Sequence, residues 1–418
     1  MTHSPLFEPL TLPNGATLKN RLAKAAMEES LAAYGQLPDA KLHRLYQRWA
    51  AGGAGLLITG NVMISPAALS GPASVVLQNG TDLAPFKAWA KAGRSGGGEF
   101  WMQINHPGRQ VMASLGEETV SASDVAVTIP GMEKNFSKPR ALSESEILDI
   151  IERFATTAAL AEEAGFTGVQ IHAAHGYLIN QFLSPLSNRR ADQWGGSLEN
   201  RARLLFEAVR AVRARVSEKF TVTVKLNSAD FQKGGFELDD AKWVVEQLGE
   251  MSVDLVEISG GSYESPAMSG QREDGTSTGR REAYFVDFAR EVAAIAKVPI
   301  MVTGGIRSKD VAEAALVNQT GGIGVSVLGM ARALAFEPDL VNQWKSNKTP
   351  EIRIPQVNWK NKRLAGFAAM VLAYNQIEQL ALGKRPKPRR FPFLALLRNQ
   401  LQASKWTKRY RKWRDATA

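Results

Sequence analysis

Residues 168–177 read Gly-Val-Gln-Ile-His-Ala-Ala-His-Gly-Tyr, an apolar strand that ends in polar side chains. His172 and His175 are two of only five histidines in the chain. Imidazole donates hydrogen bonds in either tautomer and titrates near neutral pH. A single histidine here would more simply cap a loop or fill the core. A pair followed by Tyr177 indicates a site that holds an oxygen atom and delivers a proton.

Seven further apolar runs with strand character lie on either side of this strand. In chain order, the eight predicted strands are Arg21–Ala25, Gly55–Thr59, Phe100–Asn105, Gly168–His172, Val222–Leu226, Val253–Ile258, Val298–Thr303 and Gly324–Leu328. The predicted helices between them are Asp39–Ala51, Asp82–Gly93, Glu144–Ala164, Glu199–Arg215, Asp239–Glu250, Tyr284–Ala296, Lys309–Asn318 and Arg332–Trp344. Ser143 and Glu146 resemble a capping box at the start of one of these helices.

Eight strands alternating with eight helices predict an α/β fold that closes as a (β/α)₈ TIM barrel. An open doubly wound sheet is the alternative, but it would usually show a glycine-rich fingerprint after its first strand. Here Met27-Glu28-Glu29-Ser30 follows that strand. In a barrel the site lies at the carboxyl ends of the strands. Four candidate side chains fall there: His106, His172, Lys225 and Thr303.

Glycine-rich turns follow the seventh and eighth predicted strands, at Thr303-Gly304-Gly305 and at Met330-Ala331-Arg332 after Gly329. Barrels often bind phosphate at this position through loop N–H groups and a helix N-terminus. Glycine lets the backbone approach an anion, and Arg332 can supply a bidentate charge. We expect a phosphate cradle, which could belong to a substrate or to a cofactor.

The 418 residues are 44% hydrophobic and 22% charged, as in ordinary globular proteins. There is no cysteine, which excludes disulfides and thiolate ligands. The net charge of +10 is unevenly distributed, because residues 351–418 have a charge of +13 and residues 1–350 a charge of −3. We therefore predict a barrel domain at 1–350 and a basic, partly helical extension at 351–418.

The extension alternates aromatic and basic residues at 406–414, a composition that can bind nucleic acid or an anionic membrane. We favour a terminal helix with Leu397, Trp406 and Trp413 packed on the barrel or on a neighbouring subunit of a homo-oligomer. Peripheral membrane contact is possible but not favoured, and no nucleic-acid partner is expected. With no signal peptide or apolar membrane span in the sequence, the cytoplasm is the expected compartment.

Four motifs follow one another in the chain. They are Gln-Ile-Asn-His-Pro-Gly-Arg-Gln at 103–110, His-Ala-Ala-His-Gly-Tyr at 172–177, Phe-Leu-Ser-Pro-Leu-Ser-Asn at 182–188 and Asp-Gln-Trp-Gly-Gly-Ser-Leu-Glu-Asn-Arg at 192–201. With Leu-Lys-Asn-Arg at 18–21, they resemble the Old Yellow Enzyme family of FMN-dependent ene-reductases, also described as NADH:flavin oxidoreductases. The resemblance extends through residues 5–345.

The resemblance implies a barrel with noncovalent FMN, which NADH or NADPH reduces. The substrate would be a small electron-poor alkene conjugated to a carbonyl or nitro group. His172 and His175 would hold its activating oxygen while flavin N5 gives hydride to the β-carbon. Tyr177 would protonate the α-carbon.

The same resemblance, with the phosphate cradle, implies a set of cofactor-binding residues and no metal ligand. This set is Ala26, Met27, Glu28, Gly60, Gln103, Lys225, Thr303, Gly304, Gly305, Met330, Ala331 and Arg332. Gln103 would bond the flavin's polar edge, and Gly60 would let backbone approach it. Lys225 stands where the family usually has arginine beside flavin N1 and O2, so it keeps the charge but loses the planar fork.

The chain departs from the family pattern at two of these positions. Glu28 stands where many relatives have threonine or cysteine beside flavin O4. An ionised carboxylate there would disfavour added electron density on the ring, whereas a protonated one could donate to O4. Ala331 replaces a usual glycine.

Three other functions remain open from the residues alone. A flavin-dependent dehydrogenase or an NADH oxidase would use the same cofactor on another small substrate. A metal-dependent hydrolase using His106, His172 and His175 would need carboxylates that the motif lacks. A flavin- or phosphate-binding protein without catalysis is the third.

Overall fold

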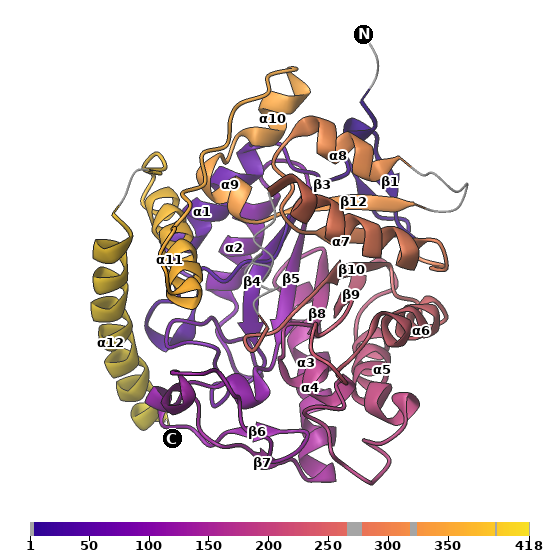
Figure 1. Cartoon of the computed structure of the whole chain (residues 1–418), viewed down its shortest axis with the longest axis vertical. Coiled ribbons are helices and arrows are strands. Elements are labelled where there is room, and N and C mark those ends of the chain that lie inside the picture. The colour runs from indigo at the N-terminus through magenta and orange to yellow at the C-terminus, as the bar shows by residue number, and fades with distance from the viewer. Residues whose placement is uncertain (1–3, 266–277, 318–323, 389–390, 418) are drawn as a thin grey trace.

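In the computed structural model, which describes residues 4–265, 278–317, 324–388 and 391–417, eight parallel strands form a closed barrel (Figure 1). These strands are β3 (Leu22–Lys24), β4 (Leu56–Met63), β5 (Glu99–Asn105), β8 (Gly168–Ala173), β9 (Thr221–Asn227), β10 (Leu255–Ser259), β11 (Ile300–Thr303) and β12 (Val325–Met330). Each strand pairs with the next in this order, and β12 pairs with β3 to close the ring. The predicted (β/α)₈ barrel is confirmed.

Helices surround the barrel on its outside (Figure 1). They are α1 (Ala40–Ala51), α2 (Ala84–Arg94), α3 (Glu144–Glu163), α4 (Leu178–Leu183), α5 (Leu198–Arg215), α6 (Leu238–Gly249), α7 (Thr278–Ala293), α8 (Lys309–Leu316), α9 (Arg332–Phe336), α10 (Leu340–Lys345), α11 (Lys362–Ala381) and α12 (Pro392–Thr417). Short 3₁₀ turns occur at Pro5–Phe7, Tyr34–Gln36, Gly108–Gln110, Ala113–Leu115 and Glu133–Asn135. The predicted capping box is confirmed, because Ser143 and Glu146 exchange both of its hydrogen bonds.

One predicted helix is wrong. The pattern at Arg332–Trp344 predicts a single helix, but the chain forms α9 and α10 with a break between them. Pro338 lies in the break, and proline has no N–H to continue a helix. The predicted end of the preceding helix, Asn318, lies outside the described residues.

The two ends of the barrel interior differ in polarity. Near the amino ends of the strands, Trp101, Leu255 and Val327 pack with Leu12 and Leu18. The last two belong to a short hairpin of β1 (Leu10–Thr11) and β2 (Thr17–Leu18). A set of linked polar side chains lies further toward the carboxyl ends. There, long loops follow the strands, and a small sheet of β6 (Val120–Ser121) and β7 (Arg140–Ala141) lies within one of them.

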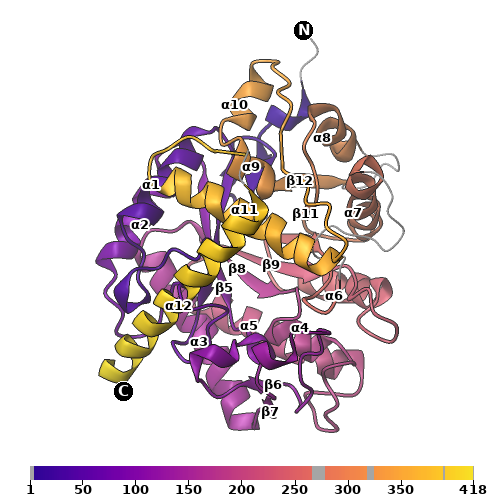
Figure 2. The same ribbon diagram turned by 60° about the vertical axis from the view of Figure 1, so that its left-hand side comes forward.

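The C-terminal extension forms the helices α11 and α12, as predicted. Ala373 and Ile377 of α11 join the core shared by the barrel and its helices. Figure 2 shows α12 lying across α11 on the outside of the molecule. Among the described residues, no helix combines the length and apolar character needed to cross a bilayer.

Candidate functional site

A buried polar chain crosses the barrel interior just below the strand ends. The Nε2 atom of Gln103 on β5 donates to Oε1 of Gln170 on β8, at 2.8 Å. Gln170 in turn donates to Glu257 on β10, at 2.7 Å. Lys225 on β9 forms an ion pair with the other oxygen of Glu257, at 2.7 Å, and both side chains are buried. The pairing of β9 with β10 places Lys225 directly beside Glu257.

This polar chain contains two residues, Gln170 and Glu257, that the sequence analysis missed. Glu257 is the one charged residue in the apolar run Val253–Ile258 apart from Asp254 at its edge. A buried charge needs a partner, so a carboxylate inside an apolar strand could have indicated from the sequence that a cation or another polar group lies beside it. Its pairing means that Lys225 does not present an isolated positive charge to the barrel mouth.

His172 offers one free hydrogen-bond donor. Its Nδ1 atom accepts the Ala174 N–H at 3.2 Å, so its proton lies on Nε2. Nε2 has no partner in the part of the chain that the structure describes. Burial, followed by the neighbouring His175 and Lys225, lowers the pKa of His172 well below its usual value. The ring is therefore a neutral donor at pH 7.

His175 lies beside His172 in a tight turn. The two rings meet edge-on with centroids 5.1 Å apart. His175 has a φ of 62° and Gly176 a φ of 76°, so the turn uses the left-handed region twice. The His175 Nε2 atom is 2.8 Å from Oγ of Ser259, and its backbone N–H donates to Asn227. Burial also lowers the pKa of His175, so this ring is neutral too.

Tyr177 completes the group of three predicted catalytic side chains. Its ring lies edge-on to His172 at 4.8 Å, so the structure brings these residues together. The Tyr177 hydroxyl is 2.8 Å from the hydroxyl of Tyr263, in the loop after β10. Burial raises the pKa of both tyrosines above the usual value, so both stay protonated at neutral pH. Tyr263 was missed, although it follows a strand end within Ser-Gly-Gly-Ser-Tyr.

The loops around these side chains are fixed by buried polar contacts. Gln181 on α4 accepts from the Arg109 N–H and donates to the carbonyl oxygens of Pro107 and Gly176. Arg109 also forms an ion pair with Glu264, at 2.5 Å, next to Tyr263. Gln181 and Arg109 therefore link the loops after β5, β8 and β10, which present the site.

Glu28 faces the tyrosines from the loop after β3. Ser70 donates to its carboxylate at 3.1 Å. Burial raises the pKa of Glu28 to about 7. The Glu28 charge also helps to raise the pKa values of Tyr263 and Tyr374, which places it near both. Tyr374 belongs to α11, so the extension contributes a side chain that the family motifs could not indicate.

Gly60 has a role that the sequence did not suggest. Its N–H donates to Oε1 of Glu29 at 2.8 Å. A Cβ atom at Gly60 would lie 2.2 Å from Oε2 of Glu29 and 2.7 Å from the Met27 carbonyl oxygen. Glycine is therefore required by the packing of the loop after β3, whether or not a flavin approaches. Ala26, in the same loop, packs against the apolar cluster of the barrel interior.

The predicted phosphate-binding residues lie together at the ends of β11 and β12. Thr303 is paired with Gly329, where a Cβ would lie 1.9 Å from the threonine Oγ1. Gly304 and Gly305 follow, and Gly305 has a φ of 66°. On the other strand, Met330 accepts a backbone hydrogen bond from Ala25, at 3.0 Å. Ala331 and Arg332 then begin α9.

Some buried polar atoms at this end of the barrel have no hydrogen-bond partner among the described residues. They include Oγ1 of Thr303 and both amide atoms of Asn105 at the end of β5. Buried polar groups without partners are costly unless a ligand or water satisfies them. These free atoms and the glycine turns fit a bound group with several polar atoms.

A metal centre finds no support in the described part of the chain. No three His, Asp or Glu side chains gather there as metal ligands. His106 does follow β5 as predicted, but its Nδ1 accepts the Gly108 N–H at 3.0 Å. Burial lowers the pKa of His106 to about 3. Its ring therefore stabilises a loop turn as a neutral acceptor.

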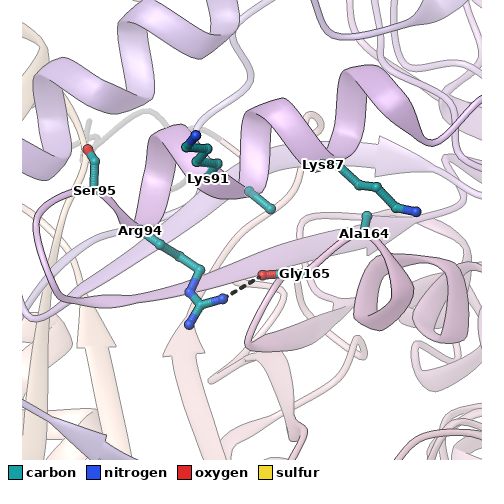
Figure 3. A pocket seen from close by; sticks show the side chains of 7 residues that line it. Lys87, Lys91, Arg94, Ser95, Ala164 and Gly165 are labelled. Atoms are coloured by element: carbon teal, nitrogen blue, oxygen red, sulfur yellow. Dashed lines mark hydrogen bonds between the residues drawn. The ribbon is translucent and has the colours of Figure 1, made fainter.

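A hollow lined by basic side chains lies at the opposite end of the barrel (Figure 3). Lys87, Lys91 and Arg94 of α2 line it together with Gly165, whose carbonyl accepts from Arg94 at 3.3 Å. Residues 94 and 165 precede the amino ends of β5 and β8. The hollow is thus remote from the histidines at the carboxyl ends.

The sequence pattern of the NADH:flavin oxidoreductase / NADH oxidase family matches residues 5–351. This is most of the chain and includes every strand of the barrel. The chain belongs to this family. Members of the family share FMN and NADH, so the protein is an FMN-dependent NADH:flavin oxidoreductase of the Old Yellow Enzyme type.

Relatives within the family include the NADH-dependent flavin oxidoreductase iliE of Hypocrea jecorina, 40% identical over 79% of this chain and 86% of that protein. An NADH oxidase of Thermoanaerobacter brockii is 31% identical over 84% of this chain and 52% of its own length. Among solved structures, morphinone reductase in complex with tetrahydroNAD is similar with a TM-score of 0.69. It is 25% identical, over 84% of this chain and 93% of that one.

Proposed function

We propose that this oxidoreductase reduces the C=C bond of α,β-unsaturated carbonyl or nitro compounds. The observation that supports the proposal best is that a histidine N–H and a tyrosine O–H, two different proton donors, lie side by side at the strand ends. His172 has a free Nε2–H, and the Tyr177 hydroxyl is protonated. When bound, FMN accepts hydride from NADH and supplies hydride from N5 to the β-carbon of the alkene.

His172 and His175 would bind the carbonyl or nitro oxygen of the substrate. A neutral donor fixed in place polarises the alkene as negative charge develops on that oxygen. The Nδ1 bond to the Ala174 N–H keeps the His172 proton on Nε2. Ser259 orients the His175 ring from its other side.

Tyr177 would protonate the α-carbon. A phenol with a raised pKa remains a proton source at neutral pH, and the carbanion that forms beside a carbonyl is a strong enough base to take that proton. The Tyr263 hydroxyl, at 2.8 Å, holds the Tyr177 hydroxyl in place, and Tyr177 recovers its proton from solvent after the step. Tyr263 thus acts through Tyr177 as a positioning residue.

The cofactor-binding residues are proposed on the same basis. Gln103 and Lys225, in the buried polar chain, would hold the polar edge of the flavin ring. Thr303, Gly305 and Arg332 would hold its phosphate, with Gly304, Met330 and Ala331 shaping the turns. Ala26, Met27 and Glu28 would border the ring from the loop after β3, and Gly60 would border it from β4.

Anaerobic steady-state kinetics with NADH tests this function. We expect NADH oxidation that depends on 2-cyclohexenone and yields cyclohexanone in equal amount. In a parallel assay in air, oxidation of NADH by oxygen, together with no anaerobic product from enones or nitroalkenes, would instead support an NADH oxidase. Reduction of the flavin by an amine, with the same failure on alkenes, would support a dehydrogenase.

A further inference from the structure

The helix α12 has two faces of different character along its 26 residues. Successive side chains rotate by about 100° around a helix axis. On this geometry, Ala395, Trp406, Tyr410 and Trp413 share one face. The opposite face holds two groups, the apolar residues Phe393, Leu394, Leu397 and Leu401, and the basic residues Lys405, Lys408 and Lys412.

The first face is docked on the protein. Ala395 packs with Val371 and Leu372 of α11, and Tyr410 is buried among residues of the loops after β4 and β5. The Tyr410 hydroxyl is 2.8 Å from the Glu117 carboxylate, which also pairs with Arg414 at 2.8 Å. The aromatic-basic segment 406–414 is thus mainly a docking element, as favoured from the sequence, and Trp413 packs beside Tyr410. The prediction that Leu397 also packs on the barrel is wrong, because its side chain is 50% exposed.

The second face is open to solvent. Phe393, Leu394, Leu397 and Leu401, with Phe391 just before the helix, are each between 50% and 79% exposed. The helix beneath is similar, since Leu364, Phe367 and Met370 of α11 are also exposed. Single exposed apolar residues are common, but a run of them on one helix face marks an interaction site. Figures 1 and 2 show α12 as the outermost layer of this side.

The positive charges next to this apolar face indicate which class of partner it binds. Lys405, Lys408 and Lys412 are exposed and form no ion pair with the described residues. Lys384, Arg385 and Lys387 precede the helix and are exposed as well, within an extension of charge +13. A nucleic acid would use the cations and the phenylalanine rings, but it would leave Leu394, Leu397 and Leu401 exposed. A second copy of the chain would bring the same positive charge to the contact.

We propose that the exposed face of α12 binds the surface of an anionic membrane. The apolar half would insert at the boundary between headgroups and acyl chains, and the lysines would contact anionic headgroups. The helix would lie in the plane of the surface, because its other face remains docked on the barrel loops. This inference goes beyond the proposed reaction and does not depend on it.

Co-sedimentation of the full-length holoenzyme with vesicles tests the proposal. Phosphatidylcholine vesicles with and without about 30% phosphatidylglycerol are compared at about 0.1 M and about 0.5 M NaCl. We expect binding only to the anionic vesicles, reduced by about tenfold or more at the higher salt. Absence of binding to anionic vesicles at low salt would overturn the proposal.

Two variants separate the two halves of the face. Leu397→Ser with Leu401→Ser removes apolar contact, and Lys405→Glu with Lys408→Glu and Lys412→Glu removes the positive charge. Each should weaken binding by about tenfold or more while FMN content and turnover of a soluble substrate stay unchanged. The matched control is Lys41→Glu with Lys91→Glu and Lys219→Glu, the same change of charge at exposed lysines of the barrel.

The outcomes are distinct. Equal loss of vesicle binding in the control would show attraction by net charge alone and overturn the docking surface. A dimer in solution that the Leu397→Ser, Leu401→Ser variant converts to monomer, without vesicle binding, would make a second copy the occupant. Tight salt-dependent binding of RNA, without binding of anionic vesicles, would also overturn the proposal.

Discussion

At the scale of single residues, His172 is the hydrogen-bond donor of the site that is best placed to polarise the substrate. Replacing His172 with alanine removes a donor that meets developing negative charge, so kcat/KM for 2-cyclohexenone should fall by about 10²-fold or more. FMN content should not change. The control is His43→Gln, at a half-buried histidine of α1 that bonds the Pro85 carbonyl. An unchanged kcat/KM in His172→Ala would remove His172 from the proposed role.

Glu28 should set the pH dependence of the flavin potential. Its pKa is raised to about 7, so the carboxylate is neutral below that pH and negatively charged above it. A negative charge near the ring disfavours reduction, so Glu28→Gln should raise the flavin midpoint potential at about pH 8 but not at about pH 6. Spectroelectrochemistry of both proteins measures this. A shift of the same size at both pH values, or none, would show that Glu28 does not titrate beside the flavin.

The sequence predicted the three catalytic candidates because they are adjacent in one motif. Tyr263 and Tyr374 were not predicted, because they lie far from that motif in the sequence. Tyr263 reaches Tyr177 through a hydrogen bond between segments far apart in the chain, and the charge of Glu28 acts on Tyr374 across a larger separation; neither tyrosine stands in a motif of its own. Glu257 was similarly hidden in an apolar strand until the strand pairing placed Lys225 beside it.

At the scale of elements, α11 connects the extension to the site through Tyr374. Tyr374→Ala should leave a space beside Glu28 and Tyr263, so KM for a small enone should rise more than kcat falls. Tyr374→Phe keeps the ring and should retain the parent KM. Steady-state kinetics with 2-cyclohexenone compares the two variants. Identical KM values for Tyr374→Ala and the parent would place this side chain outside the substrate site.

The strands and most helices followed from periodicity, because burial on both faces of a parallel barrel gives continuous apolar runs. The helix predicted at Arg332–Trp344 failed because the apolar pattern continues across Pro338, whereas the backbone cannot. For residues 351–418 the sequence predicted, from composition, only a basic and partly helical extension. The docking of α12 depends on Tyr410 and Glu117, which are 293 residues apart in the sequence.

At the scale of the whole molecule, acid should destabilise the fold through its buried histidines. The pKa values of His106, His172 and His175 are lowered on folding, so the unfolded chain binds more protons below about pH 6.5. The free energy of unfolding that these neutral rings contribute is therefore present above that pH and is lost as the pH falls. The loss is at most about 1.4 kcal/mol per pH unit for each histidine. The raised pKa values of Glu28 and Asp254 oppose this trend, and the lowered pKa of the half-buried His43 adds to it.

Thermal unfolding of the holoenzyme between about pH 7 and about pH 5 measures this effect. Tm should fall across that interval. A variant with His172→Gln and His175→Gln should show a smaller fall, since two of the three groups no longer titrate. A Tm that stays constant, or an equal fall in the variant, would contradict the neutral state of these rings.

The proposed reaction requires that Tyr177 supply the proton, and Tyr177→Phe tests this most directly. The variant is reduced by NADH without oxygen and then mixed with alkene in a stopped-flow instrument that follows flavin reoxidation. Reoxidation by 2-cyclohexenone should slow by about 10²-fold or more, the usual contribution of a general acid. Reduction by NADH should be unchanged, and a nitroalkene, whose nitronate product is stable, should still accept hydride. Reoxidation by 2-cyclohexenone at the parent rate would contradict the account and assign the proton to another group.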